Sequence, residues 1–562
     1  MKIFLVNPNL LDFRSDEYDV FSVPSGLYYI GAVLKNHGFD AEIINLAAKT
    51  HPLDYLKEEL KTKKPRIVAF SVLNANRFGA FQAVLEVKKF DKNIIAVFGG
   101  PCASFLPEHI FKALPQLDYI VSGEGEFVFL ELVKMIQKKF NCPETINGIW
   151  YKKDNKILKT ENQQLIENLD ILPDPAQYFD FQHLSLSRGC PGNCKFCGSP
   201  KFWGRGNVRF HSASWFVDQL ETLYKRGITH FYISDDTFTM DKKRVIEVCT
   251  KIIARKINIS FAAISRVDFI NKDILFFMRK AGCIQISYGV ESGAIKIRKK
   301  LGKPVVDERI IKTFRLTCSY GILPRAYFIY GSPGETYETI QASCDLINQI
   351  KPLGAIFYLL VVFPGTEFYN ELKKNNLVSD EIWHEAIEDI PWFEFDSNLC
   401  FEDVKEFGEN LRKAFFTNLD KFVWDINLID NKELFAEHAK FLSRLGLTFS
   451  NGEYAENKYV KDWDNRKIAE TLFKKALTYD CDLDAYLGLG MLFQKQGRFE
   501  KAMFFLEKGL DYFPDSYDIN VCMGICCMNI KKFSKALMYF NKFKNISGLD
   551  YYIDICNKKI LE

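Results

Sequence analysis

The feature that most constrains the fold is a regular alternation of short apolar runs and helix-like segments over residues 1–400. Apolar runs of strand length, separated by helical segments, are typical of parallel strands joined by crossover helices. We therefore predict an α/β fold whose first domain, residues 1–140, is a doubly wound parallel sheet. Its expected strands are KIFLVNPN (2–9), FDAEIINL (39–46), PRIVAFSVL (65–73), NIIAVFGG (93–100) and LDYIVSGEGE (117–126).

Small residues occupy the loops at the carboxyl ends of these predicted strands. In a Rossmann-like sheet, ligands bind at that edge, near the point where the strand order reverses. Two adjacent glycines, Gly99 and Gly100, would let a bulky planar ligand approach the backbone. The pattern predicts a crevice for a nucleotide-sized or cofactor-sized ligand. Its candidate residues are Asn7, Ser71, Gly99, Gly100, Gly123 and Glu124.

Three cysteines, Cys190, Cys194 and Cys197, lie close together in the stretch LSLSRGCPGNCKFCGSP (184–200). Four thiolates would complete a structural zinc site or an iron–sulfur site, whereas three leave one coordination position open. The next cysteine, Cys249, lies far outside this loop. A structural zinc site completed by a flanking histidine remains an alternative. The flanking histidines are His183 and His211.

The spacing Cx3CxxC, with Phe196 before the last cysteine, resembles the signature of the radical S-adenosylmethionine (SAM) superfamily. In that family, the three thiolates hold a 4Fe-4S cluster, and SAM binds its open iron. Reductive cleavage of SAM then releases a 5′-deoxyadenosyl radical. The resemblance implies the same chemistry here, with Cys190, Cys194 and Cys197 as cluster ligands.

The resemblance also implies a partial (β/α)6 barrel over residues 183–400, and six strand-like runs between 183 and 365 fit it. In this family, SAM is bound at the carboxyl ends of the barrel strands. Asp235 and Asp236 would accept from its amino group, Arg266 would pair with its carboxylate, and Glu291 would bind the ribose hydroxyls. Taken singly, these side chains are also consistent with a helix cap, a surface ion pair and a helix-opening charge. The full set of expected SAM residues is Asp235, Asp236, Arg266, Glu291, Ser292 and Gly331.

A second resemblance concerns the first domain. VPSGLYYIGAVLKNHGFDAEIINL (23–46), VFGGPCASFLPE (97–108) and VSGEGE (121–126) look like the cobalamin-binding domain of one branch of radical SAM enzymes. The histidine that replaces the lower base of the cofactor in other cobalamin domains has no counterpart in the loop 7–26. A Rossmann-like domain without cofactor remains the alternative. The resemblance implies cobalamin as the ligand of the predicted crevice.

After residue 400 the sequence pattern changes: apolar residues recur at helical spacing, and the strand-like runs end. We expect a helical connector over residues 401–464 and repeats over 465–562. Gly490, Phe499, Ala502 and Leu506 recur 34 residues later as Gly524, Phe533, Ala536 and Phe540. This recurrence resembles tetratricopeptide (TPR) repeats and implies an all-α tail that presents a peptide or protein partner. Cys522, Cys526 and Cys527 are expected in its core rather than in a second cluster.

Composition excludes several other classes. A net charge of +3 on 562 residues is too small to create the strong positive potential that attracts nucleic acid. No apolar stretch is long enough to span a membrane. The start of the chain does not resemble a signal peptide, so its 15 cysteines are expected to be reduced in the cytoplasm. Residues 141–182 are expected to be a linker. The aromatic segment 382–395 is expected either to line the barrel mouth or to form an inter-domain core.

Together these features predict a radical SAM enzyme with cobalamin, most plausibly a methyltransferase that acts on an unactivated carbon. The expected partners are a small-molecule, carrier-bound or peptide substrate and an electron donor such as flavodoxin or ferredoxin. One alternative is a radical SAM enzyme without cobalamin, such as a cyclase, a rearrangement enzyme or a methylthiotransferase-like enzyme. Another is a non-catalytic adaptor with an iron–sulfur site and TPR repeats.

Overall fold

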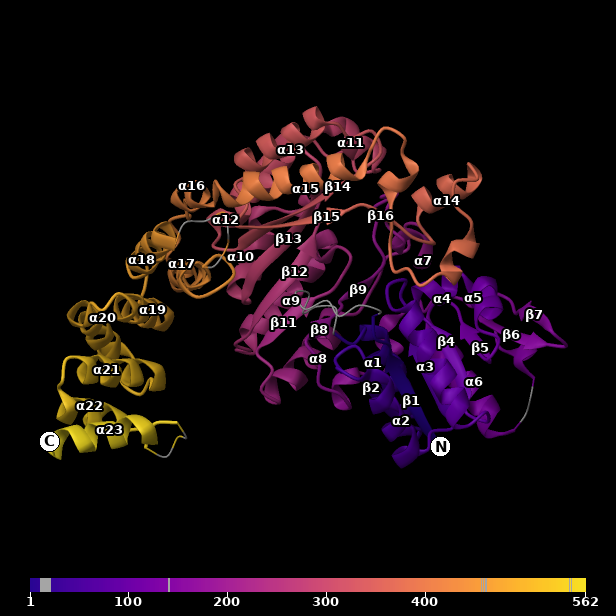
Figure 1. Ribbon diagram of the computed structural model, residues 1–562, viewed down its shortest axis with the longest axis horizontal. Helices are drawn as coiled ribbons and strands as arrows, with labels where there is room; N and C mark the ends of the chain where they lie inside the picture. Colours follow the sequence, from indigo (N-terminus) through magenta and orange to yellow (C-terminus); the bar gives the residue numbers. More distant parts are fainter. Residues whose placement is uncertain are drawn as a thin grey trace.

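The structure, a computed structural model, describes residues 1–10, 22–139, 142–455, 457, 459, 462–544, 546 and 548–561. Figure 1 shows three regions: an N-terminal α/β domain, a central α/β barrel, and a helical tail that extends from the barrel on the side away from the first domain. The predicted fold class is confirmed. Much of the histidine-free loop 7–26 lies outside the described residues.

The first domain is built on a parallel sheet in the order β2-β1-β3-β4-β5, extended by two further strands. This order reverses between β1 and β3, as in flavodoxin-like sheets, and so places a ligand-binding crevice at their carboxyl ends. The parallel strands are β1 (Lys2–Asn7), β2 (Asp40–Asn45), β3 (Ile67–Ser71), β4 (Ile95–Gly99) and β5 (Tyr119–Val121). All five coincide with predicted strands.

Helices cover both faces of this sheet because its strands carry apolar residues on both sides. Ile3 and Leu5 of β1 pack into one core, and Phe4 and Val6 pack into the other. The first core is closed by α1 (Ser25–Asn36) and α6 (Gly125–Gln137). The second is closed by α2 (Pro52–Lys63), α3 (Arg77–Phe90), α4 (Pro101–Phe105) and α5 (Pro107–Ala113).

The segment expected to be a linker, residues 141–182, instead contains two strands. They are β6 (Ile149–Lys153) and β7 (Lys156–Lys159), which pair antiparallel with each other, and β6 also pairs antiparallel with β5. Ile149 and Tyr151 are buried in the core beneath α1 and α6. The first sheet therefore extends to residue 159.

The central sheet has six parallel strands in sequential order, from β8 at one edge to β15 at the other. Since these two edge strands do not pair with each other, the barrel is partial, as predicted. The strands are β8 (His183–Leu184), β11 (His230–Ile233), β12 (Ser260–Ser265), β13 (Cys283–Glu291), β14 (Leu323–Tyr330) and β15 (Gly354–Leu359). The intervening helices are α7 (Ser199–Phe202), α8 (Ala213–Lys225), α9 (Lys242–Ala254), α10 (Lys272–Lys280), α11 (Ile295–Lys300), α12 (Asp307–Ser319) and α13 (Tyr337–Ile350).

The helix α9 illustrates how local sequence builds this barrel. Asp241 caps its first turn by accepting a hydrogen bond from the Arg244 backbone N–H at 3.1 Å. Helical spacing then places Val245, Val248 and Ile252 on one face, all three buried against the sheet. Two short strand pairs complete the region. They are β9 (Ser187–Arg188) with β10 (Arg209–Phe210), and β16 (Val361–Val362) with β17 (Ile390–Pro391).

The chain after the barrel returns to the first domain. This segment contains α14 (Glu367–Lys374) and the 3-10 helix η7 (Asp380–His384). Trp383 is fully buried in the core formed with α2, α3 and α5. The aromatic segment was expected either to line the barrel mouth or to form an inter-domain core. Trp383 lies in an inter-domain core.

After residue 400, the described residues form helices joined by loops and contain no strand. Gly490 and Gly524, which occupy the same position in the 34-residue repeat, lie against Leu506 and Phe540, and an added Cβ would come within 2.4 Å and 2.3 Å of these side chains. Cys526 and Cys527 are fully buried. The helices are α15 (Phe401–Phe416), α16 (Leu419–Trp424), α17 (Phe435–Ser450), α18 (Asp462–Ala476), α19 (Leu483–Lys495), α20 (Phe499–Tyr512), α21 (Tyr517–Asn529), α22 (Phe533–Asn541) and α23 (Asp550–Leu561).

None of these helices is both long and apolar enough to cross a membrane, as judged over the described residues.

Candidate active site

The three cysteines of the predicted cluster lie in the loop between β9 and α7, and all are free thiols. The Gly192 backbone N–H points to the Cys190 Sγ at 3.3 Å. Burial raises the pKa of Cys194, and it raises that of Cys197 to about 11. These buried thiols therefore need an electropositive partner to become thiolates.

The separation of the three sulfurs indicates what kind of centre they fit. Among the described residues, the Sγ atoms of Cys190, Cys194 and Cys197 are not gathered within 4.8 Å of one another. A single zinc ion with bonds of about 2.3 Å would require sulfurs roughly 3.8 Å apart. As placed here, the three thiols are therefore not gathered around a single zinc ion. Moreover, His183 is paired with Ser234, and His211 is paired with Asp170.

Arg266, at the carboxyl end of β12, lies against this cysteine loop. Its guanidinium is 3.9 Å from the Cys194 Sγ and donates to Asp268 at 3.0 Å. A Cβ on Gly192 would come within 3.0 Å of the guanidinium, so the close approach depends on this glycine. The positively charged guanidinium therefore lies beside the cysteine loop, where it can pair with an anionic ligand.

Glu291 ends β13 in an uncommon backbone conformation, with a φ of 68°. Its carboxylate forms an ion pair of 2.7 Å with Lys303, and both side chains are about 7 % exposed. A Cβ on Gly289 would lie only 2.2 Å from this carboxylate, so glycine is required there. Both charges are close enough to Cys194 to influence its pKa. A strained residue that holds a buried charge is a frequent feature of ligand sites.

The two adjacent aspartates after β11 have different environments. Asp235 is buried, accepts from the backbone N–H of Leu186 at 2.8 Å, and also accepts from the Ser187 hydroxyl. Burial raises the pKa of Asp235 to about 7. Asp236 accepts from the Ser199 hydroxyl at 2.5 Å and lines the large pocket described below. The carboxylate available to a ligand is that of Asp236.

The last two predicted SAM residues, Ser292 and Gly331, have local structural roles. Ser292 is buried, and its hydroxyl accepts from the backbone N–H of Ala294 at 3.2 Å. Gly331 follows β14 with a φ of 74°. A Cβ there would approach Leu359 to 2.9 Å.

A large pocket lies between the first sheet and the barrel, and its space of about 1360 Å³ includes open solvent. Its wall on the first domain is formed at the carboxyl ends of β3, β4 and β5, where the sequence predicts a crevice. Asn7 is not part of this wall, and its side chain donates to Asn45 at 2.9 Å. The barrel contributes Ser234 and Asp236, and Phe202 and Trp203 also line the pocket. The predicted residues in the wall are Ser71, Gly99, Gly100, Gly123 and Glu124.

A buried charge network joins the two domains along this pocket. Arg188 of β9 donates to Glu124 and Glu126 at 2.6 Å each, and Arg209 of β10 donates to Glu124 at 2.7 Å. Burial alone would raise the pKa of Glu124, but the two arginines hold it below its ordinary value. The Glu126 Oε2 and the Arg209 Nε are buried with no hydrogen-bond partner among the described residues. Glu124 is therefore part of the inter-domain contact as well as of the pocket wall.

A second buried polar group lies beside this network. His211 lines the pocket, its Nδ1 lies 3.1 Å from Asp170, and its Nε2 lies 3.3 Å from the Tyr29 hydroxyl. Its ring stacks on Trp215 with centroids 3.6 Å apart. Burial, and then the charge of Arg188, lower the pKa of His211 to about 3. His211 is thus neutral in the folded protein over the physiological range.

This depressed pKa predicts an acid-sensitive fold. The unfolded chain binds a proton at His211 below about pH 6.5, whereas the folded chain does not, so stability is full above pH 6.5 and falls as the pH decreases towards the folded pKa. For His211→Gln we expect a shallower loss of stability between pH 6.5 and 5, by up to about 1.4 kcal/mol per pH unit. Denaturation midpoints of both chains at pH 7.5 and 5.5 test this. Parallel curves for the two chains would contradict a neutral buried His211.

Comparisons with known proteins agree with this geometry. Residues 184–347 match the family model for the radical SAM superfamily, and residues 16–133 match that for the B12 binding domain. A protein of Pyrococcus horikoshii, named as an uncharacterized methyltransferase, is 30% identical over 395 residues, which cover 68% of this chain and 85% of that protein. An anaerobic magnesium-protoporphyrin IX monomethyl ester cyclase of Rubrivivax gelatinosus is 29% identical over 74% of this chain and 76% of its own length.

Solved structures show the same fold. The methyltransferase TsrM from Kitasatospora setae, with cobalamin and a 4Fe-4S cluster bound, superposes with a TM-score of 0.61 at 16% identity, covering 85% of this chain and 99% of that one. The cobalamin-dependent enzyme OxsB, with aqua-cobalamin and SAM bound, gives 0.56 at 18% identity, covering 100% and 83%. The cofactors expected from the sequence, a 4Fe-4S cluster, SAM and cobalamin, are those of the two matched domains. The chain is an enzyme of the radical SAM superfamily, in the branch that carries an N-terminal B12-binding domain.

Proposed function

We propose that the protein is a cobalamin-dependent methyltransferase that transfers a methyl group to an unactivated carbon of a small-molecule, carrier-bound or peptide substrate. The observation that carries this proposal is the position of the large pocket. Its walls come from the carboxyl ends of both parallel sheets, with Gly99 and Gly100 on one side and Ser234 and Asp236 on the other. Asp236 also accepts a hydrogen bond from Ser199, two residues after Cys197. A ligand in the pocket would therefore lie next to the cysteine loop.

The overall reaction balances with two molecules of SAM. Substrate R–H, two SAM molecules and two electrons from a donor such as flavodoxin or ferredoxin give R–CH3, 5′-deoxyadenosine, methionine and S-adenosylhomocysteine. When bound, the cluster supplies the electron that cleaves one SAM, and cobalamin carries the methyl group of the other. Hydrogen abstraction by a radical is what makes a carbon without an acidic proton accessible.

The residues of the chain have assigned roles in this proposal. Cys190, Cys194 and Cys197 bind the cluster, and the guanidinium of Arg266 pairs with the SAM carboxylate. By the resemblance to the family, Glu291, whose carboxylate pairs with Lys303 at the end of β13, accepts from the ribose hydroxyls. Asp236 accepts from the amino group of SAM. Phe202 and Trp203 add aromatic surface to the pocket wall, and excluding water there would protect a radical from quenching.

The helical tail is proposed to bind a protein partner or a substrate carrier. Large apolar side chains are exposed on it, where a globular domain would normally bury them. Examples are Phe504 on α20, Met538 on α22 and Tyr551 on α23, which are 51 %, 72 % and 69 % exposed. The domain limits that we propose are 1–159 for the first domain, which includes the β6–β7 hairpin, 183–400 for the barrel, 401–464 for a connector and 465–562 for the repeats.

Anaerobic reconstitution with iron, sulfide and hydroxocobalamin tests the proposed function. We expect about four irons and one cobalamin per chain after desalting. With SAM and a reductant, a methyltransferase forms S-adenosylhomocysteine as well as 5′-deoxyadenosine. The matched relatives include both a methyltransferase and a cyclase by name, and this product separates the two possibilities. Release of 5′-deoxyadenosine without S-adenosylhomocysteine in the presence of bound cobalamin would overturn methyl transfer.

A further inference from the structure

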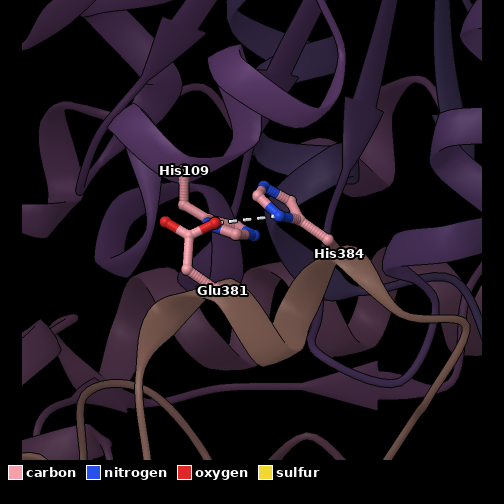
Figure 2. A group of neighbouring side chains, drawn as sticks. All are labelled: His109, Glu381 and His384. Carbon is pink, nitrogen blue, oxygen red and sulfur yellow. Dashed lines mark ion pairs between the residues drawn. The ribbon is translucent and has the colours of Figure 1, made fainter.

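Two histidines and a glutamate meet at a place remote in sequence from the cysteines. His109 lies on α5 of the first domain, and Glu381 and His384 lie on η7 of the segment that returns from the barrel (Figure 2). The potential ligand atoms of these three side chains all lie within 4.8 Å of one another. None of the three lines the large pocket between the two sheets. The group is thus a separate cluster, built across the boundary of the first domain.

One ring nitrogen of His109 has no hydrogen-bond partner. The residue is 5 % exposed, and its Nε2 is buried with no hydrogen-bond partner among the described residues. Leaving a buried polar atom unpaired is costly, so such an atom calls for an explanation. Burial, and then the neighbouring His384, lower the pKa of His109. A buried imidazole nitrogen without a partner is an atom that a metal ion can satisfy.

The two partners of His109 are placed within reach of one ion. The rings of His109 and His384 lie 3.9 Å apart between centroids, at an angle of 23°. The Nδ1 of His384 lies 3.0 Å from the Glu381 carboxylate, the ion pair drawn in Figure 2. Two imidazoles and one carboxylate are a common ligand set for Zn²⁺. Bonds of about 2.0 Å in a tetrahedron require ligand atoms roughly 3.3 Å apart, so binding an ion requires the two stacked rings to turn a nitrogen each towards one point.

The backbone that carries Glu381 and His384 is firmly anchored. Trp383, between them, is fully buried, and its Nε1 donates to the Tyr369 hydroxyl at 2.7 Å. Directly after His384, the backbone is held by Arg77 of α3, which donates to the carbonyl oxygens of Glu385 at 3.3 Å and Ile387 at 2.9 Å. Ligands on an anchored segment lose little conformational freedom when they bind an ion. The segment therefore presents a nearly preformed half-site to His109.

We propose that His109, Glu381 and His384 bind a Zn²⁺ ion that links the first domain to the segment following the barrel. Three protein ligands leave a fourth position for water. The ion would satisfy the buried nitrogen of His109 and would join α5 to η7, adding a coordinate link to the apolar contact around Trp383. Its role is to hold the first domain in place against the barrel, independently of the cluster, of cobalamin and of the reaction that the enzyme catalyses.

The test uses the full-length protein with its 4Fe-4S cluster loaded, so that the three loop cysteines are occupied. The chains to compare are wild type, His384→Gln and Glu381→Gln, which alter exposed ligands, and His51→Gln, which alters an exposed histidine on another surface. Zinc content is measured after dialysis against a chelator-buffered Zn²⁺ solution, with iron content and circular dichroism confirming that each chain is loaded and folded. We expect wild type and His51→Gln to retain one more zinc per chain than the two ligand variants. Loss of a ligand should weaken binding by more than the roughly 10- to 100-fold typical of changes outside the coordination sphere.

Thermal unfolding gives a second readout that does not depend on counting ions. Zn²⁺ should raise the unfolding temperature of wild type and of His51→Gln, and should not raise that of His384→Gln or Glu381→Gln, because only a bound ion stabilises the folded state. His109→Gln is a further variant, and it should behave like the other two ligand variants. Equal zinc content and equal thermal shifts in all the chains would overturn the proposal, whatever the outcome of the reconstitution with cobalamin.

Discussion

Replacing Cys194 with alanine is expected to abolish binding of the 4Fe-4S cluster and, with it, all reductive cleavage of SAM. A site with three thiolate ligands holds the cluster through all of them, and the loss of one leaves an iron without a protein ligand. The expected iron content falls from about four per chain to near zero. Iron and sulfide analysis, the visible absorption of the cluster and the release of 5′-deoxyadenosine measure the effect on one sample.

The matched control is Cys481→Ala, which removes an exposed thiol in the tail and should leave the iron content unchanged. Cobalamin uptake separates loss of the cluster from loss of the fold. Because the pocket is walled largely by the first domain and by β9, the Cys194→Ala chain should still bind cobalamin as wild type does. Retention of about four irons by Cys194→Ala would show that the cluster is held elsewhere, and the assignment of the cysteine loop would be wrong.

The two parallel sheets could be predicted from the sequence because their strands are short apolar runs with clear helical segments between them. The hairpin β6–β7 could not, because KILK and IWYKK are half polar and lie at a sheet edge, where burial on both faces is not required. Ile149 and Tyr151 are fully part of the core, whereas Trp150, Ile157 and Leu158 pack against the cores only partly buried. A pattern search that expects apolar runs therefore reads the segment as a linker.

The sequence predicts where the candidate SAM residues lie, because each follows the end of a strand. It does not predict in which direction each side chain points. Asp235 and Asp236 follow β11 where the chain enters a turn, so their side chains have different surroundings. The structure buries Asp235 against Leu186 and Ser187 and leaves Asp236 at the pocket. Lys303 was missed because it lies 12 residues after its partner Glu291, with α11 between them. The pairing across a helix has no local sequence signal.

The residues that join the two domains were also missed, because their partners lie 62 and 64 positions apart in the chain. A signal was nevertheless present. Arg188 interrupts an otherwise small and apolar run, LSLSRG, and a charge in a predicted buried strand requires a buried counter-charge. The matching carboxylates are Glu124 and Glu126 in VSGEGE, which the sequence reading assigned to the crevice alone. The arginine in LSLSRG and the carboxylates in VSGEGE are therefore explained together, as partners in one ion-pair network.

Substitution of Arg188 by methionine is expected to destabilise the protein by about 3–5 kcal/mol, the usual cost of breaking a buried ion pair by removing one partner. Glu126 would be left buried with no cation, and Glu124 would keep only Arg209. The Arg188 guanidinium also lies 5.1 Å from the Tyr29 ring and 5.8 Å from that of Trp203, so packing at the pocket wall would be lost as well. Midpoints of urea unfolding at pH 7, followed by fluorescence, measure the effect.

Two further chains make this result specific to the buried charges. Arg226→Met breaks an ion pair with Asp180 in which both side chains are more than a third exposed, and it should cost less than about 1 kcal/mol. The double variant Arg188→Met with Glu126→Gln removes the charge that Arg188→Met leaves uncompensated, so it should recover part of the lost stability. If the double variant recovered stability but bound less cobalamin than wild type, Arg188 would shape the pocket as well as stabilise the fold. If Arg188→Met were no more damaging than Arg226→Met, the two domains would not be held together by this network.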